Sequence, residues 1–185
     1  LFLDMIERAR ELSREPDTYW NDQLNNVSSI GGYSGLGEEI WRQSGGEIDA
    51  FVQCVGTGAS SRGVATVLRQ RKAGVRIVCV EPAESPVLAG GQPGAHNIEG
   101  IGIGFVPPLY EPSLVDEVIQ ISTNDAKAMA RRLAREESVF AGTSSGANVL
   151  AAIQVGRRLG PGAKVATLMI DSGLKYVSTD VYSSK

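Results

Sequence analysis

A strand-like run that turns through glycines into a helix-like run is the feature that most limits how this chain can fold. Residues 50–55 form an apolar run of the length typical of a buried strand. The run stops at the glycine turn 56–58, and a helical pattern begins at Ser60 or Ser61. Backbone N–H groups at the start of a helix lack partners within it, and the helix dipole favours negative charge there. The turn therefore predicts a phosphate site, with a plain strand-to-helix connection as the alternative.

The same alternation continues along the rest of the chain. Further strand-like runs are expected at residues 75–80, 116–121 and 165–170, and segments long enough for helices separate them. Strands that alternate with helices favour parallel pairing, with helices on both faces of the sheet. The predicted fold class is therefore α/β, a three-layer, doubly wound, mostly parallel sheet.

The N-terminal part of the chain is less regular. We expect an amphipathic helix at residues 2–14, a short strand at 18–20, mainly loop at 21–37 and one or two helical turns at 38–43. Residues 33–185 are predicted to form the main domain, and residues 1–32 to be the remnant and linker of a smaller one. Because the chain starts at Leu1, within a helical pattern, we expect it to be a portion of a longer protein.

Composition narrows the possible partners and the compartment. The 185 residues carry a net charge of −3, which gives no basic field for nucleic acid. No apolar run approaches the roughly 20 residues that a membrane-spanning helix needs, so no membrane partner is expected. The two cysteines, Cys54 and Cys79, both lie in strand-like runs and suggest buried thiols rather than a disulfide framework. A cytoplasmic location is the simplest expectation.

The glycine turn allows more than one reading from residue spacing. In an NAD-dependent oxidoreductase, an acid about 20 residues after the turn binds the ribose, and Glu81 has that position. The third glycine of that fingerprint would fall at position 61, where this chain has Ser61. A Walker-type loop would require a lysine that the turn lacks. A non-catalytic module that binds a phosphate-bearing ligand remains an alternative.

Several segments in their sequence order carry a more specific resemblance. These are Gly56-Thr57-Gly58-Ala59-Ser60, residues 80–88, residues 98–107, and Asp171-Ser172-Gly173 with the residues that follow. Together they resemble the cysteine synthase (O-acetylserine sulfhydrylase) and cystathionine β-synthase family, which are fold-type II enzymes dependent on pyridoxal 5'-phosphate. The resemblance implies a transferase or lyase that makes cysteine, or a related amino acid, from an activated serine and a sulfur nucleophile. It also implies a homodimer.

The resemblance assigns roles to particular residues. The cofactor phosphate would be held by Gly56, Thr57, Gly58, Ala59 and Ser60, although Ala59-Ser60 replaces the Gly-Thr usual in the family. Gly102 belongs to a glycine-rich segment expected to line the cofactor. Ser172 is expected beneath the pyridine nitrogen, where a neutral hydroxyl suits β-elimination. Gln23 resembles a glutamine near the substrate carboxylate, with a solvated loop amide as the alternative.

The family's catalytic lysine, which forms the Schiff base, has no counterpart in this chain. The lysines sit at a helix end, in surface-like contexts or after the cofactor contact; they are Lys72, Lys127, Lys164, Lys175 and Lys185. No catalytic residue is therefore assigned, and the isolated chain is expected to be inactive. His96 has no acid or cysteine at ligand spacing, so we expect a surface loop residue and no metal site.

Overall fold

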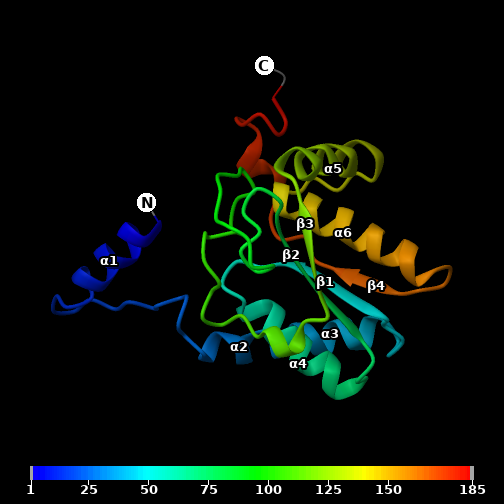
Figure 1. Ribbon diagram of the computed structural model, residues 1–185, viewed down its shortest axis with the longest axis horizontal. Coiled ribbons are helices and arrows are strands. Elements are labelled where there is room, and N and C mark those ends of the chain that lie inside the picture. Colours follow the sequence, from blue (N-terminus) through cyan, green and yellow to red (C-terminus); the bar gives the residue numbers. More distant parts are fainter. Residues whose placement is uncertain (1, 184–185) are drawn as a thin grey trace.

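The structure, a computed structural model that describes residues 2–183, contains a four-stranded parallel sheet (Figure 1). The strand order is β3-β2-β1-β4. The strands are β1 (Ala50–Cys54), β2 (Arg76–Pro82), β3 (Glu117–Ile121) and β4 (Val165–Thr167). The four strands predicted from residue 50 onward are present and parallel. The last is shorter than expected, because β4 pairs with β1 only along Val165–Thr167.

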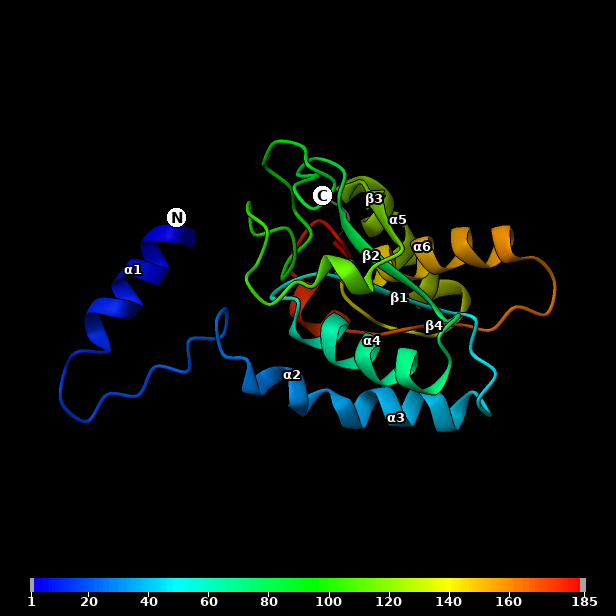
Figure 2. The same ribbon diagram turned by 60° about the horizontal axis from the view of Figure 1, so that its bottom comes forward.

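Helices cover both faces of this sheet (Figures 1 and 2). One face carries α2 (Ser28–Gly32), α3 (Ser34–Gln43) and α4 (Ala59–Arg71), and the other carries α5 (Thr123–Glu136) and α6 (Thr143–Leu159). Each face has its own apolar core, one formed with α3 and α4 and the other with α5 and α6. The predicted three-layer α/β fold is confirmed.

Strand β1 lies between β2 and β4 and is buried along its whole length. Val52 and Cys54 belong to the core on the α6 side, and Phe51 belongs to the core on the α4 side. Successive side chains of a strand point to opposite faces, so a central strand between two helical layers must be apolar on both. This explains the continuous apolar run in the sequence.

Close helix packing, rather than a loop, accounts for several glycines near the N-terminus. Residues 21–37 were predicted to be mainly loop, yet this range contains α2 and the first turn of α3, residues 34–37. A Cβ on Gly37 would come within 2.8 Å of the Cβ of Val67 on α4, and one on Gly63 would come within 2.5 Å of the Ile30 carbonyl. The prediction was wrong because glycines that let helices approach closely resemble turn glycines in a sequence.

Helix α1 (Phe2–Leu12) has no buried residue and lies apart from the sheet in both views (Figures 1 and 2). It is two residues shorter than the predicted helix. Residues 18–20 do not form the expected strand, since no strand lies alongside to pair with them. Among the described residues, no helix combines the length and apolar character needed to cross a membrane.

A long irregular stretch connects β2 and β3. Residues 83–116 contain only the short 3-10 helix η1 (Pro112–Leu114). At the other end of β3, Ser122 accepts a hydrogen bond from the Asp125 N–H and so caps α5. The irregular stretch begins where β2 ends, and Gly102 within it bonds to Val55 just after β1. It therefore lies at the carboxyl ends of β1 and β2, where ligands bind in open parallel sheets.

Candidate functional site

The turn after β1 has a backbone shape that only glycine allows. Gly58 precedes α4 with a φ of +87°, and a Cβ there would lie 2.6 Å from the backbone nitrogen of Tyr110. At Gly56 a Cβ would lie 2.6 Å from the carbonyl oxygen of Gly100. The backbone of residues 100 and 110 therefore packs directly against the turn, and glycine is required at positions 56 and 58 because a side chain at either would collide with that backbone.

The turn presents hydrogen-bond donors at the N-terminus of α4. Within residues 2–183, the backbone N–H groups of Ser60 and Ser61 have no hydrogen-bond acceptor, and the residue at the N-cap, Gly58, has no side chain to supply one. Thr57 and Ser60 are partly exposed, so their hydroxyl groups can reach a ligand. Because α4 is 13 residues long, its dipole adds to the attraction for an anion. The arrangement suits a phosphate group.

A glycine-rich segment, residues 100–104, lies against this turn. The N–H of Gly102 donates to the Val55 carbonyl at 3.4 Å, immediately before Gly56. His96 holds the segment: its Nε2 contacts the Gly102 carbonyl at 2.8 Å, and its Nδ1 accepts from the Ile98 N–H at 3.2 Å. His96 is thus partly buried and bonded through both ring nitrogens, which corrects the expectation of a simple surface residue.

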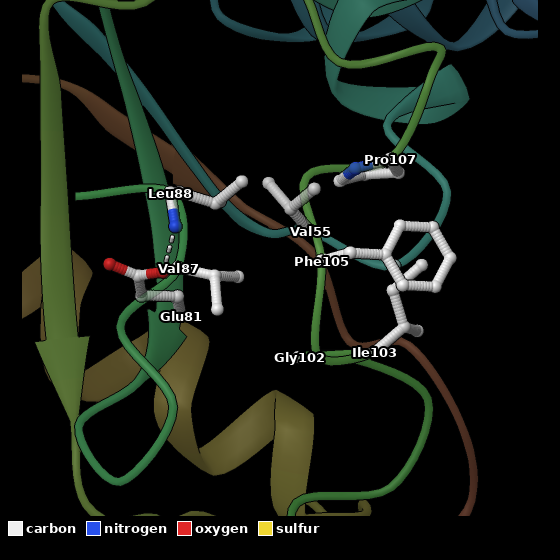
Figure 3. Close-up of a pocket in the computed structure, with 9 residues that line it drawn as sticks. Val55, Glu81, Val87, Leu88, Gly102, Ile103, Phe105 and Pro107 are labelled. Carbon is white, nitrogen blue, oxygen red and sulfur yellow. Dashed lines mark hydrogen bonds between the residues drawn. The ribbon is translucent and has the colours of Figure 1, made fainter. Parts of the chain in front are cut away.

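A small cavity of about 10 Å³ lies beside this segment (Figure 3). The side chains of Val55 and Leu88 point toward each other across it. Glu81, only 2% exposed, accepts hydrogen bonds from the Leu88 N–H at 2.7 Å and the Ala89 N–H at 3.1 Å. Burial raises the pKa of Glu81, and these two hydrogen bonds oppose that shift. Since both carboxylate oxygens are engaged, Glu81 is not available for the ribose contact of a dinucleotide site.

Ser172 lies at the same edge of the sheet, beyond the end of β4. It precedes the 3-10 helix η2 (Gly173–Tyr176) and forms an isolated bridge with Ala141. Its Oγ accepts a hydrogen bond from the Leu174 N–H at 3.2 Å, and the side chain is exposed. Because that oxygen already accepts a hydrogen bond, its proton remains free to donate to a ligand.

The N-terminus of α6 joins the two parts of the candidate site. Thr143 donates through Oγ1 to the Glu99 carboxylate at 3.0 Å, next to the glycine-rich segment. The Gly142 N–H donates to the Asp171 carbonyl at 3.2 Å, next to Ser172. The glycine turn, the glycine-rich segment and Ser172 are therefore linked by contacts at one end of the sheet.

A larger hollow, about 710 Å³, lies at the opposite end of the sheet, where the strands begin. Its charged side chains already pair with one another: Arg69 bonds to Asp116 at 2.6 Å, and Lys72 bonds to Asp49 at 3.1 Å. Both pairs also bond to the backbone. Paired charges offer little to a new ligand, so the glycine turn remains the stronger candidate site.

Comparison with known proteins decides the family. The family described as "Pyridoxal-phosphate dependent enzyme" matches residues 2–171. This chain belongs to the pyridoxal-phosphate-dependent enzymes. A cysteine synthase of Staphylococcus aureus is 39% identical over 180 residues, which cover 96% of this chain and 58% of that protein. A probable cysteine synthase of Bacillus subtilis is also 39% identical, with 96% and 59% covered.

Solved structures show the same likeness. The O-acetylserine sulfhydrylase isoform 3 of Entamoeba histolytica superposes with a TM-score of 0.92 and 38% identity, over 97% of this chain and 55% of that one. An O-acetylserine-dependent cystathionine β-synthase of Helicobacter pylori has a TM-score of 0.91 and 35% identity, over 96% and 58%. The chain thus spans somewhat more than half the length of these relatives.

The remaining predicted site residue is Gln23. It is exposed and lies in the segment between α1 and α2. Within residues 2–183, no group of three or more His, Cys, Asp or Glu side chains is arranged to hold a metal ion.

The described lysines of this chain form ion pairs away from the turn. They pair with Asp49 (Lys72), Asp180 (Lys127), Glu47 (Lys164) and Asp171 (Lys175). The surface-like context expected for Lys127 is wrong, because this residue is 6% exposed. It lies on the buried face of α5, where the apolar part of its side chain packs while the ammonium group reaches Asp180. Lys185 lies outside the described residues.

Sequence reasoning missed Gln53, a buried polar residue of β1. Its Nε2 donates to the Ser60 Oγ at 2.6 Å. A polar residue in the middle of an otherwise apolar strand was the available signal, since a buried amide needs a partner.

Proposed function

We propose that the turn formed by Gly56, Thr57, Gly58, Ala59 and Ser60 binds the phosphate group of pyridoxal 5'-phosphate. The free N–H groups of Ser60 and Ser61 at the start of α4 are the observation that carries this proposal. A phosphate dianion offers only acceptors, and the two N–H groups and the hydroxyl protons of Thr57 and Ser60 are donors that it can use. Gly56 and Gly58 let the turn pack against the backbone of residues 100 and 110, which holds these donors in place.

Two further residues are proposed to contact the cofactor ring. Gly102, held against Val55, would lie beside it, where the lack of a side chain leaves room. Ser172 would donate its free hydroxyl proton to the pyridine nitrogen, since its oxygen already accepts from Leu174. When bound, pyridoxal phosphate supplies an electron sink for bond breaking at an amino-acid substrate. A neutral hydroxyl at the ring nitrogen moderates that sink.

For the protein that contains this chain, we propose the formation of cysteine, or a related amino acid, from an activated serine and a sulfur nucleophile. The 39% identity to two cysteine synthases supports this activity. We further propose that residues 33–185 form the cofactor-binding part and residues 1–32 belong to a smaller domain, in which Gln23 serves the substrate carboxylate. A homodimer and a cytoplasmic location are proposed, the latter because Cys54 and Cys79 are buried free thiols.

The chain alone is proposed to be inactive. The described lysines are engaged in ion pairs away from the glycine turn, so none is placed to bind the cofactor covalently. The residues of this chain would hold the phosphate and the ring nitrogen, and the amine would come from elsewhere in the full-length protein. Formation of cysteine by the purified 185-residue chain, at the rate of an enzyme, would contradict this proposal.

The proposed function is tested with the full-length protein. Its apoform is titrated with pyridoxal phosphate, and cysteine formation from O-acetylserine and sulfide is measured. Replacing Thr57 by Val removes a hydroxyl and is expected to weaken cofactor binding about tenfold, since hydrogen bonds to charged groups contribute about 1.5–3 kcal/mol. Binding of NAD in place of pyridoxal phosphate, or equal affinity of the variant, would argue against it.

A further inference from the structure

Gln53 occupies an unusual place for a glutamine. It lies near the end of β1, the central strand, and is only 4% exposed. By strand alternation it shares the face of Phe51, toward α4 rather than α6. Its Nε2 donates to the Ser60 Oγ at 2.6 Å. The buried amide therefore lies directly behind the hydroxyl that faces the proposed phosphate site.

The other end of the same amide has no partner. Within residues 2–183, the Gln53 Oε1 is buried and accepts no hydrogen bond. Buried polar atoms are nearly always paired, because leaving one unpaired costs stability. Within the described residues, the hydrogen bond to Ser60 is therefore the only one that the Gln53 side chain makes. This points to a role for Gln53 in orienting the Ser60 hydroxyl group.

The direction of this hydrogen bond decides what Ser60 can offer a ligand. A serine hydroxyl has one proton and two lone pairs. When Gln53 donates to its oxygen, the Ser60 proton stays free for the ligand. In the reverse sense the proton would point at Gln53, and only lone pairs would face the site. Because a phosphate dianion has no proton to share, it requires the first arrangement.

The neighbouring hydroxyl groups support this reasoning. Thr57 Oγ1 accepts from the Ala59 N–H at 3.3 Å, so its proton is also left for the ligand side. Ser61, in contrast, is buried and donates its proton to the Gly58 carbonyl at 3.0 Å. The two partly exposed hydroxyl groups each receive an internal donor, and the buried one does not.

We propose that Gln53 is a positioning residue that fixes the Ser60 hydroxyl as a donor toward the phosphate of the cofactor. This rests on the proposed function, because it needs a phosphate at the turn. It also gives Ser60 a defined role where the family usually has a Gly-Thr pair. Gln53 acts through Ser60 and makes no contact with the cofactor itself.

The experiment measures the Kd of the full-length apoprotein for pyridoxal phosphate and for inorganic phosphate, by tryptophan fluorescence. The variants are Gln53→Met, Ser60→Ala and the double variant. We expect Ser60→Ala to weaken both ligands about tenfold, and Gln53→Met about three- to tenfold. In the Ser60→Ala background, Gln53→Met is expected to have no further effect, because the hydroxyl that it orients is gone.

Gln53→Glu provides an independent test. A carboxylate only accepts, so it would draw the Ser60 proton inward and add negative charge behind the site. We expect it to weaken phosphate binding more than Gln53→Met does, and this measurement carries the test if the Met variant does not fold. The control is Gln70→Met. Gln70 is exposed and lies on α4, the helix that also carries Ser60, so this variant should leave the Kd unchanged.

The outcomes separate this proposal from the proposed function. If Gln53→Met weakens binding equally with and without the Ser60 hydroxyl, Gln53 has only a structural role and the proposal fails. A Gln53→Glu variant that binds as tightly as the wild type would also overturn it. If Thr57→Val and Ser60→Ala both leave the Kd unchanged, the turn does not hold the phosphate, and the proposed function fails as well.

Discussion

Gly58 shows how one residue can decide whether the turn forms at all. Its φ of +87° lies in the left-handed region. A Cβ added there would lie only 2.6 Å from the backbone nitrogen of Tyr110. Gly58→Ala is expected to lower the free energy of unfolding by about 1–2 kcal/mol from the backbone alone, and further because the turn must shift. Urea denaturation checks this. Gly74→Ala is the control, because a Cβ there meets nothing within 4 Å; equal losses in both variants would contradict the prediction.

His96 is expected to stabilise the glycine-rich segment. It bonds to Gly102 and Ile98 through its two ring nitrogens, and each such bond contributes about 1 kcal/mol. His96→Ala should therefore lower the free energy of unfolding by about 1–2 kcal/mol, measured by chemical denaturation. Asn97→Ala, an exposed neighbour, should change it little. Equal stability of the His96 variant and the wild type would show that these bonds have no net effect.

Glu81 predicts a pH dependence of stability. Burial is the main cause that raises its pKa above the ordinary value of 4.5. At a pH between 4.5 and the raised pKa, Glu81 is protonated in the folded protein but ionised in the unfolded chain. Stability therefore falls as the pH rises through that window. Urea midpoints measured from pH 4 upward should show that Glu81→Gln loses this part of the slope. An identical slope in the variant would rule out Glu81 as its source.

Single residues were predicted unevenly from the sequence. The glycine turn could be found because a strand, glycines and a helix follow one another within a few positions. The roles of His96 and Gln53 could not be predicted, since their partners are brought near by folding: backbone groups for His96 and the Ser60 hydroxyl for Gln53. The His96 contact with Gly102 requires the chain to turn back on itself, which no local pattern predicts.

Some helices were predicted from the sequence and others were not. Helices α4, α5 and α6 were predicted because apolar residues recur with helical spacing on their buried sides. Helix α2 and the first turn of α3, residues 34–37, were missed, because their glycines suggested a loop. In the structure, Gly37 lets α3 pack closely against Val67 on α4. Helix–helix distance is a tertiary property, and it outweighed the local preference of glycine.

Helix α5 is tied to the C-terminal segment by a buried cation. Lys127, 6% exposed, bonds to the carboxylate of Asp180 at 2.8 Å. Asp180→Ala leaves this ammonium group without its partner, so we expect it to lower the thermal midpoint more than Lys127→Met, which removes the charge and keeps the packing. Glu47→Ala, whose partner Lys164 is half exposed, should have the smallest effect. The reverse order of midpoints would contradict the prediction.

Over the whole molecule, the three-layer arrangement was the most predictable property. Parallel strands buried on both faces produce continuous apolar runs, and these runs are visible in the sequence. The region before residue 33 was predicted least well: α1 was expected, but the strand at 18–20 was wrong and α2 was missed. Helix α1 also buries none of its side chains within the described residues. A segment whose apolar side is not covered gives no information about what it packs against.

The central position of β1 has a consequence for the timing of backbone opening. Its amide groups are bonded to β2 on one side and to β4 on the other, and every residue is buried. In hydrogen–deuterium exchange, amides of β1 should be among the last to take up deuterium, exchanging only when the protein unfolds globally. Amides of α1 should exchange within the dead time. The proposed anion-binding turn is thus joined directly to the most slowly opening part of the chain.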